Sequence, residues 1–294
     1  MKAALKILNF VFVGLCLGYL VYAVASDGET IANIFAAADA RLFLPAILLW
    51  AIGPTMSGLF AGQLLASINC KLPYSQLLSI YLNRIPAKYL PGGIWQTFAR
   101  AYDLNKLGLS KTQISILVFY ENSWTVLIAA LVSCVAMVLL YPSPAYLNIS
   151  LGILAGGLLL LPIALLLRRK ALILSFNGYV RISTTGTAYW VVSGTCFYLY
   201  ISAFSGVLDN PDPFKLVVNY MFSYVAGFIA IFAPQGIGVF EFIMTELTDF
   251  SIPQPQALVL LSGFRVVILI GDMIAWSLFL LVDRFYLSPA DKQV

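Results

Sequence analysis

The residues of this chain that could take part in chemistry are charged side chains that interrupt long apolar stretches. They are Arg84, Lys88, Arg100, Glu121, Glu241, Arg265 and Asp272. An ionisable group at the depth of a lipid bilayer is costly and needs either a partner or a water-filled cavity. These residues are therefore candidates for ion pairs that hold helices together or, alternatively, for a polar path through a membrane.

The cations around residue 90 share helical faces with other polar residues. One face, with i, i+3, i+7 spacing, consists of Tyr81, Arg84 and Lys88, and a second face consists of Gln96, Arg100 and Asp103. A basic polar surface of this kind favours an anionic headgroup as its ligand. The same cations would also suit lipid phosphates at the cytoplasmic interface, and the sequence leaves both interpretations open.

Glycines beside the charges add backbone groups that suit anion binding. The glycines counted as substrate-binding candidates are Gly92, Gly93, Gly236 and Gly238. A helix that starts after Gly93 points its unpaired N–H groups and its positive dipole end toward the membrane interior. A phosphate or a carboxylate would be stabilised there.

The acidic candidates have expected partners. Glu241 lies in the first turn after the second glycine-rich break, where the helix dipole favours a carboxylate, and we expect it to pair with Arg265 or Arg84. Arg265 and Asp272 are seven residues apart on one helical face and are expected to line one cavity. Buried carboxylates such as Glu121 are also candidates to carry protons.

Composition places the chain in a membrane. Of its 294 residues, 61% are hydrophobic and 10% are charged, and the mean hydropathy is +0.91. Soluble domains average about 45–50% apolar and about 25% charged residues, so this chain lacks the polar surface that a core in water requires. We therefore expect an integral membrane protein that forms a single polytopic domain over residues 1–294.

Residue types that are missing exclude several functions. Histidine is absent, which excludes Ser-His-Asp and Cys-His nucleophiles and His-ligated zinc or haem. The four cysteines contain no CxxC pair, so no metal and no cofactor are expected. A net charge of +4 without an aromatic-interleaved basic patch indicates no nucleic-acid partner. Most of the tryptophans are expected to be interfacial anchors or lipid-facing residues.

The apolar runs predict an all-α fold with six full transmembrane helices. The runs cover residues 5–25, 42–68, 112–140, 148–167, 186–207 and 256–282. Two further regions, 74–108 and 214–250, are interrupted by proline and glycine. We expect each to form a broken, re-entrant helical hairpin, because backbone freed at membrane depth must be buried in protein or line a cavity. A plain span with a polar exit is the alternative for each.

The distribution of lysine and arginine predicts the orientation. With both hairpins returning to the side from which they start, most cations fall into loops on the side of the N-terminus, while the opposite loops are mainly acidic. The positive-inside rule then places both termini in the cytoplasm, in an inner (cytoplasmic) membrane.

The two breaks resemble one another and predict an internal repeat. Pro91 and Pro234 are separated by 143 positions, about half the chain, and the same offset places Tyr81 against Tyr224. Since one hairpin is expected to enter from each side, the halves, about 1–141 and 142–294, would form an inverted-topology repeat.

Two motifs give the chain a family resemblance. The segment 84–95, RIPAKYLPGGIW, and the segment 233–241, APQGIGVFE, resemble motifs of the lysylphosphatidylglycerol synthase transmembrane-region family. That family includes the flippase half of the multiple peptide resistance factor and many stand-alone proteins. Gln235 occupies the place of the first glycine of the second motif. The resemblance implies a translocation cavity whose polar residues are Arg84, Lys88, Arg100, Glu121, Glu241 and Arg265.

The predicted function is that of a lipid flippase or transporter. It would move a lipid with an anionic or glycosylated, phosphate-containing headgroup, and membrane lipids would be its partners. There is no GxxxxGK[ST] motif, so energy would come from a gradient, from product removal or from downhill movement. The alternatives are a membrane glycosyl- or phosphotransferase that acts on a polyprenyl-phosphate lipid, and a non-catalytic partner of such an enzyme. The sequence leaves the oligomeric state open, a homo-oligomer included.

Overall fold

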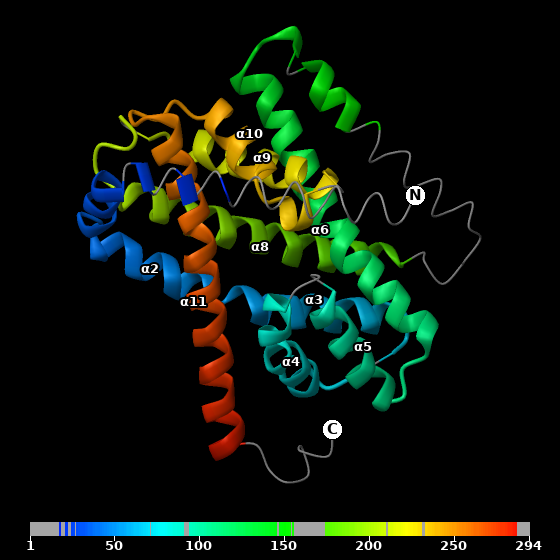
Figure 1. Ribbon diagram of the computed structural model, residues 1–294. Helices are drawn as coiled ribbons and strands as arrows, with labels where there is room; N and C mark the ends of the chain where they lie inside the picture. The colour runs from blue at the N-terminus through cyan, green and yellow to red at the C-terminus, as the bar shows by residue number, and fades with distance from the viewer. Residues whose placement is uncertain are drawn as a thin grey trace.

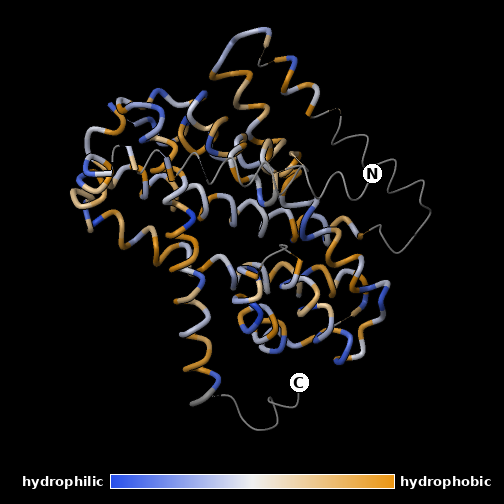
Figure 2. The backbone as a smooth tube through the Cα atoms, viewed as in Figure 1, coloured by the Kyte–Doolittle hydropathy of each residue, from blue (hydrophilic) through white to orange (hydrophobic). Residues whose placement is uncertain are grey.

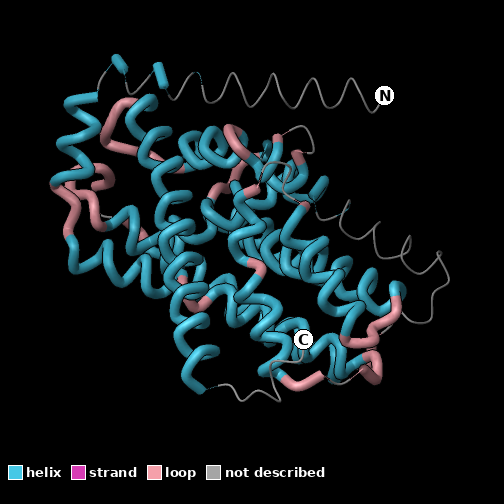
Figure 3. Tube along the Cα trace, turned by 60° about the horizontal axis from the view of Figure 1, so that its bottom comes forward, coloured by secondary structure: helices cyan, strands magenta, loops and turns pink. Residues whose placement is uncertain are grey.

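The structure is a computed structural model that describes most of the chain in atomic detail. The described residues are 18, 21–22, 25–26, 28–70, 72–90, 94–145, 147–153, 155, 174–209, 211–230 and 233–286. They form helices, turns and loops, and no strand occurs among them (Figure 3). The expected all-α class is therefore confirmed for this part. Most of the expected spans 5–25 and 148–167, and the candidates Gly92 and Gly93, lie outside the described residues.

Three helical segments of the described part are long and apolar enough to cross a membrane. They are Ala40–Ser67, Lys111–Leu140 and Gln254–Asp283. They correspond to the expected spans 42–68, 112–140 and 256–282. The first consists of α2 (Ala40–Trp50) and α3 (Gly53–Ser67), and the other two are α6 (Lys111–Leu140) and α11 (Gln254–Tyr286). Pro54 lies at the start of α3 and explains why the first span is divided, since proline fits the first turn of a helix.

The helix α8 (Phe176–Ser202) packs antiparallel to α2 and α3. Asp39 N–H donates to Ala203 O at one end (2.7 Å), and Thr185 Oγ1 donates to Gln63 Oε1 toward the other (2.8 Å). The expected span 186–207 is corrected by this helix, which begins ten residues earlier and ends at Ser202. Ser175 supplies the reason for the early start, because its hydroxyl caps the backbone of Gly178.

The first broken region consists of three short helical pieces. They are α4 (Tyr74–Asn83), the 3₁₀ helix η1 (Ile85–Tyr89) and α5 (Trp95–Lys106). Pro86, within the first turn of η1, cannot continue α4, and Arg84 takes the capping position between the two. We refer to residues 74–106 as the first hairpin.

The second broken region is a closed hairpin. It consists of α9 (Pro213–Ile229), η3 (Pro234–Gly236) and α10 (Val239–Leu247), and we refer to residues 213–247 as the second hairpin. At its base, Asn219 Nδ2 donates to Leu247 O (2.8 Å). At its tip, a methyl group on Gly236 would come 2.9 Å from Cα of Gly227. The end of α9 and the tip therefore pack backbone against backbone, which only glycine allows. The chain therefore returns to the end of the bundle from which it started.

The order of elements repeats along the chain. The series α4, α5, α6 is followed by α9, α10, α11, and α6 and α11 begin at residues 111 and 254, a difference of 143. In Figure 1, α6 runs up the page and α11 runs down it. This arrangement supports the predicted inverted repeat, whose symmetry and boundaries remain a prediction, as does the cytoplasmic position of the termini.

Aromatic side chains fill the core around α8. Phe197 stacks on Tyr220 with 4.7 Å between ring centroids, and Phe264 of α11 meets Phe197 edge-on at 5.0 Å. Apolar residues such as Leu48 of α2 and Leu139 of α6 are exposed on the outside of the bundle, whereas hydrophilic residues gather around α4 and α5 (Figure 2). Outward apolar faces of this kind suit lipid.

Candidate functional site

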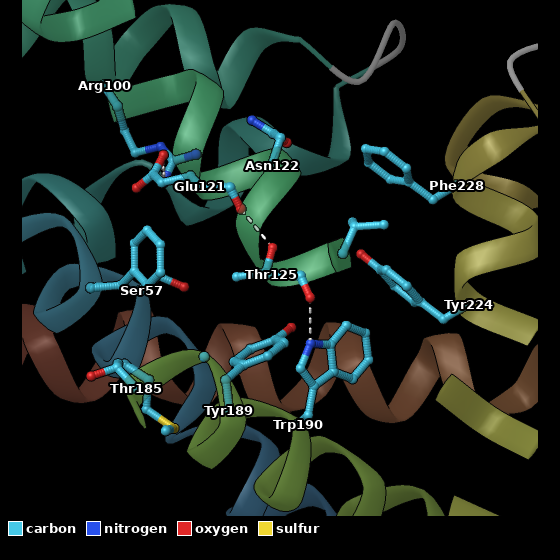
Figure 4. Close-up of a pocket in the computed structure, with 14 residues that line it drawn as sticks. Ser57, Arg100, Glu121, Asn122, Thr125, Thr185, Tyr189, Trp190, Tyr224 and Phe228 are labelled. Atoms are coloured by element: carbon cyan, nitrogen blue, oxygen red, sulfur yellow. Dashed lines mark hydrogen bonds and ion pairs between the residues drawn. The ribbon is translucent and has the colours of Figure 1, made fainter. Parts of the chain in front are cut away.

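A pocket lies where the two halves of the chain meet (Figure 4). It has a cavity volume of about 180 Å³ and is lined by helices α3, α5 and α6 from the first half and α8 and α9 from the second. Its lining residues are Met56, Ser57, Phe60, Arg100, Glu121, Asn122, Thr125, Val126, Thr185, Gly186, Tyr189, Trp190, Tyr224 and Phe228. Two of the charged residues expected from the sequence, Arg100 and Glu121, are therefore brought together at this wall.

The contact between Arg100 and Glu121 is loose. Arg100 Nη1 lies 3.7 Å from Glu121 Oε2, and the two side chains are only 15% and 13% exposed. The guanidinium lies over the ring of Tyr81, 4.5 Å from its centroid, and the Tyr81 hydroxyl donates to Glu121 Oε1. Arg100 Nε is buried and has no hydrogen-bond partner within the described residues. The wall thus holds a cation with unused donor capacity beside a carboxylate that is fixed by a tyrosine.

The opposite wall of the pocket is aromatic. Trp190 Nε1 donates to Thr125 O (2.8 Å), which fixes the indole, and Tyr224 packs edge-on against it at 4.9 Å. The hydroxyls of Tyr189 and Tyr224 both point into the pocket (Figure 4). Neither hydroxyl has a hydrogen-bond partner in the described part of the chain. Ring faces and free hydroxyls therefore lie opposite the charged wall.

Asp272 binds the tip of the first hairpin to the long helix α11. Its buried carboxylate accepts from Trp50 Nε1 (3.0 Å), Lys88 Nζ (2.9 Å) and Tyr89 Oη (2.8 Å). Three donors satisfy a buried carboxylate well, so this cluster fixes η1 against α2 and α11.

Arg84 forms an ion pair within the first hairpin. Its Nε and Nη2 bind both oxygens of Asp103, at 2.6 Å and 2.9 Å, so the pair is bidentate and links the end of α4 to α5. The predicted helical face of Tyr81, Arg84 and Lys88 is wrong because α4 ends at Asn83. The three side chains instead bind three different acids.

Glu241 pairs with Arg265, which is one of the two partners predicted for it. Arg265 Nε and Nη2 each lie 2.9 Å from Glu241 Oε1, while Glu241 Oε2 accepts from Gly238 N–H (2.7 Å). The alternative pairing with Arg84 is wrong. The break itself is tightly wound, since Gln235 (φ 54°), Gly236 (φ 67°) and Gly238 (φ 84°) all adopt left-handed backbone. Glu241 thus closes the first turn of α10 and attaches it to α11.

The predicted polar residues therefore form four separate pairs, of which one borders the pocket. Arg265 and Asp272 of α11, expected to line one cavity, bind partners on different elements: Arg265 binds α10, and Asp272 binds α2 and η1. Gln96 is partly exposed on α5. The expectation that most tryptophans are peripheral fails for Trp50 and Trp190, which are buried and donate hydrogen bonds.

Sequence reasoning also missed the aromatic wall of the pocket. The repeat aligns Tyr224 with Tyr81 and was the one available signal for it, while Tyr189 and Trp190 carry no motif. No group of three or more acidic or cysteine side chains that would hold a metal occurs among the described residues.

Comparison with known proteins identifies the family. A sequence model of the lysylphosphatidylglycerol synthase TM region matches residues 6–275. No curated protein matches the chain. The match covers most of the chain, including both hairpins and the pocket, and the chain belongs to this family of multi-pass membrane proteins.

Proposed function

From its membership of this family, we propose that the chain translocates a lipid whose headgroup contains a phosphate, and that the headgroup crosses through the pocket between the two halves. The observation that carries this proposal is the placement of Arg100. A guanidinium with an unused Nε donor lines the pocket, and it meets only a loose counter-ion. Arginine is well suited to phosphate because its planar fork offers several donors.

The two sides of α5 support the proposal. Arg100 faces the pocket, whereas Phe98 and Tyr102, each 62% exposed, face outward. A helix that is polar toward the protein and aromatic toward its surroundings separates a polar path from lipid. The headgroup would pass on the Arg100 side while the acyl or prenyl tails stay in the bilayer.

Translocation is tested with proteoliposomes in which acyl-chain-labelled phospholipids, a polyprenyl phosphate and a glycolipid are probed for headgroup accessibility. We expect protein-dependent movement of at least one phosphate lipid, with a rate at least tenfold lower in Arg100→Gln. The matched control is Arg181→Gln, which removes an exposed arginine of α8 and should keep the wild-type rate.

Two results would contradict the proposal. If no lipid moves, the proposal that this chain translocates lipid is wrong. If the lipid is converted to a new product, a membrane glycosyl- or phosphotransferase explains the pocket better, and product analysis by mass spectrometry in the same vesicles detects this case.

A further inference from the structure

We propose that the pocket selects headgroups without net charge, in which one phosphate is balanced by one amine. This inference rests on the proposed translocation and narrows the class of lipid. It follows from the charges of the pocket wall, from the loose contact between them and from the aromatic residues that face them.

The wall of the pocket is electrically neutral. Among its lining residues, Arg100 is the one cation and Glu121 the one anion. Both side chains are largely buried, so neither charge is well solvated. A ligand that leaves both of them with a partner is therefore favoured, because a largely buried charge that loses its partner costs free energy.

A headgroup with a phosphate alone does not meet this condition. Its phosphate would take the guanidinium of Arg100, and Glu121 would keep only the hydrogen bond from Tyr81. The site would then hold an excess negative charge in a poorly solvated pocket. A headgroup with both phosphate and ammonium exchanges one ion pair for two, since its phosphate binds Arg100 and its ammonium binds Glu121.

The geometry favours this exchange. The separation of 3.7 Å between Arg100 Nη1 and Glu121 Oε2 exceeds a charge-assisted hydrogen bond, so little is lost when a ligand enters between them. Tyr81 contacts both side chains and keeps them in place during the exchange.

The aromatic wall provides a second partner for the ammonium. Tyr189, Trp190 and Tyr224 line the pocket opposite the charged pair, as Figure 4 shows. Ammonium groups are attracted to the faces of such rings, and the free tyrosine hydroxyls accept hydrogen bonds from them. An amine therefore has favourable positions on both sides of Glu121.

The test compares lipids that differ in one charge. Vesicles contain the wild-type protein and acyl-chain-labelled phosphatidylethanolamine, its N-acetylated form, which keeps the phosphate but loses the ammonium charge, or phosphatidylglycerol. We expect phosphatidylethanolamine to move at least tenfold faster than the other two. Glu121→Gln leaves a cationic wall and should lower this ratio at least tenfold, whereas Glu246→Gln, which removes an exposed carboxylate of α10, should keep it.

A binding measurement covers the case in which Glu121→Gln does not fold. Short-chain phosphatidylethanolamine, titrated into the wild-type protein in detergent, should quench tryptophan fluorescence at a concentration at least tenfold lower than its N-acetylated form does.

Equal rates for the amine and N-acetyl lipids in the wild type, or equal affinities in detergent, would overturn the charge selection. A ratio unchanged by Glu121→Gln would do so as well. Each of these results leaves translocation itself standing, whereas the failure of every lipid to move contradicts the proposed function instead.

Discussion

The two hairpins carry similar ion pairs with opposite arrangements of charge. In the first half, the cation Arg100 is on the hairpin and the anion Glu121 is on the following long helix. In the second half, the anion Glu241 is on the hairpin and the cation Arg265 is on the long helix. Glu121 and Arg265 differ by 144 positions, which is one more than the repeat offset.

The two pairs also differ in how completely they are satisfied. Glu241 is bound by two nitrogens of Arg265 and by the N–H of Gly238, and the pair closes a tightly wound break. Arg100 and Glu121 have no direct hydrogen bond to each other and border the pocket. The comparison indicates that one half uses its pair to hold the hairpin, whereas the other half keeps its pair available for a ligand.

The largest effect is expected at the tip of the second hairpin. Gly236→Ala should lower the free energy of unfolding by about 3 kcal/mol, because the added methyl meets the backbone of Gly227 and the residue has positive φ. The measurement is denaturant unfolding in mixed micelles. Gly62→Ala in α3 is the control, since its methyl meets only the end of Leu77, at 3.3 Å. Equal losses of unfolding free energy in the two variants would show that the tip of the second hairpin does not require glycine at position 236.

Removing the cation of each pair compares the pairs directly. Arg265→Gln should cost about 2 kcal/mol, because Arg265 is one-third exposed but Glu241 remains buried with the Gly238 N–H as its main partner. Arg100→Gln should cost about 1 kcal/mol, because Glu121 keeps Tyr81 and borders a pocket. The unfolding midpoints of both variants show which one loses more stability. A larger loss of stability in Arg100→Gln than in Arg265→Gln would reverse the roles assigned to the two pairs.

The first hairpin is held instead by Asp272. Asp272→Asn should cost about 1 kcal/mol, since the amide oxygen still accepts from Trp50 and the amide NH2 donates to the Tyr89 hydroxyl, while half-buried Lys88 turns to water. A double-mutant cycle with Lys88→Met measures the pair alone and should give a coupling of about 0.5–1 kcal/mol. Zero coupling would mean that the hydrogen bonds, and not the ion pair, fix η1.

The smallest effect is expected at Gln235, where the second motif departs from the glycine of the family pattern. Its left-handed conformation (φ 54°) suits glycine, so Gln235→Gly should stabilise the protein by about 0.5–1 kcal/mol. Asn69 has a similar φ of 58°, but asparagine tolerates it. Asn69→Gly should therefore change stability by less than about 0.5 kcal/mol. A destabilised Gln235→Gly variant would show that the glutamine side chain is needed at the tip.

The sequence was sufficient for the broken regions because proline and glycine act locally. Pro86 ends α4, and the run from Pro234 to Gly238 separates α10 from α9, in both cases through backbone restrictions that neighbouring residues do not alter. The pairing of Glu241 with Arg265 was one of two that the sequence left open, because a carboxylate at membrane depth requires a cation and both Arg265 and Arg84 could supply it.

The pocket was not predictable from local pattern. Its aromatic wall depends on the antiparallel packing of α8 against α3 and on the approach of α9, contacts between residues more than 100 positions apart in several cases. For the same reason, Lys88 and Asp272, 184 positions apart, were both singled out without being recognised as a pair. Helical spacing failed at Tyr81, Arg84 and Lys88 because it assumes a continuous helix.

The base of the second hairpin has a mechanical consequence. Tyr141, at the end of α6, donates to Leu247 O, and Asn219 donates to the same oxygen. With its base fastened in this way and its tip closed at Gly227 and Gly236, the hairpin is held at both ends, so a displacement of its base would move it as a rigid unit. Tilting at the fastened end would be transmitted along α9 to Tyr224 in the pocket wall.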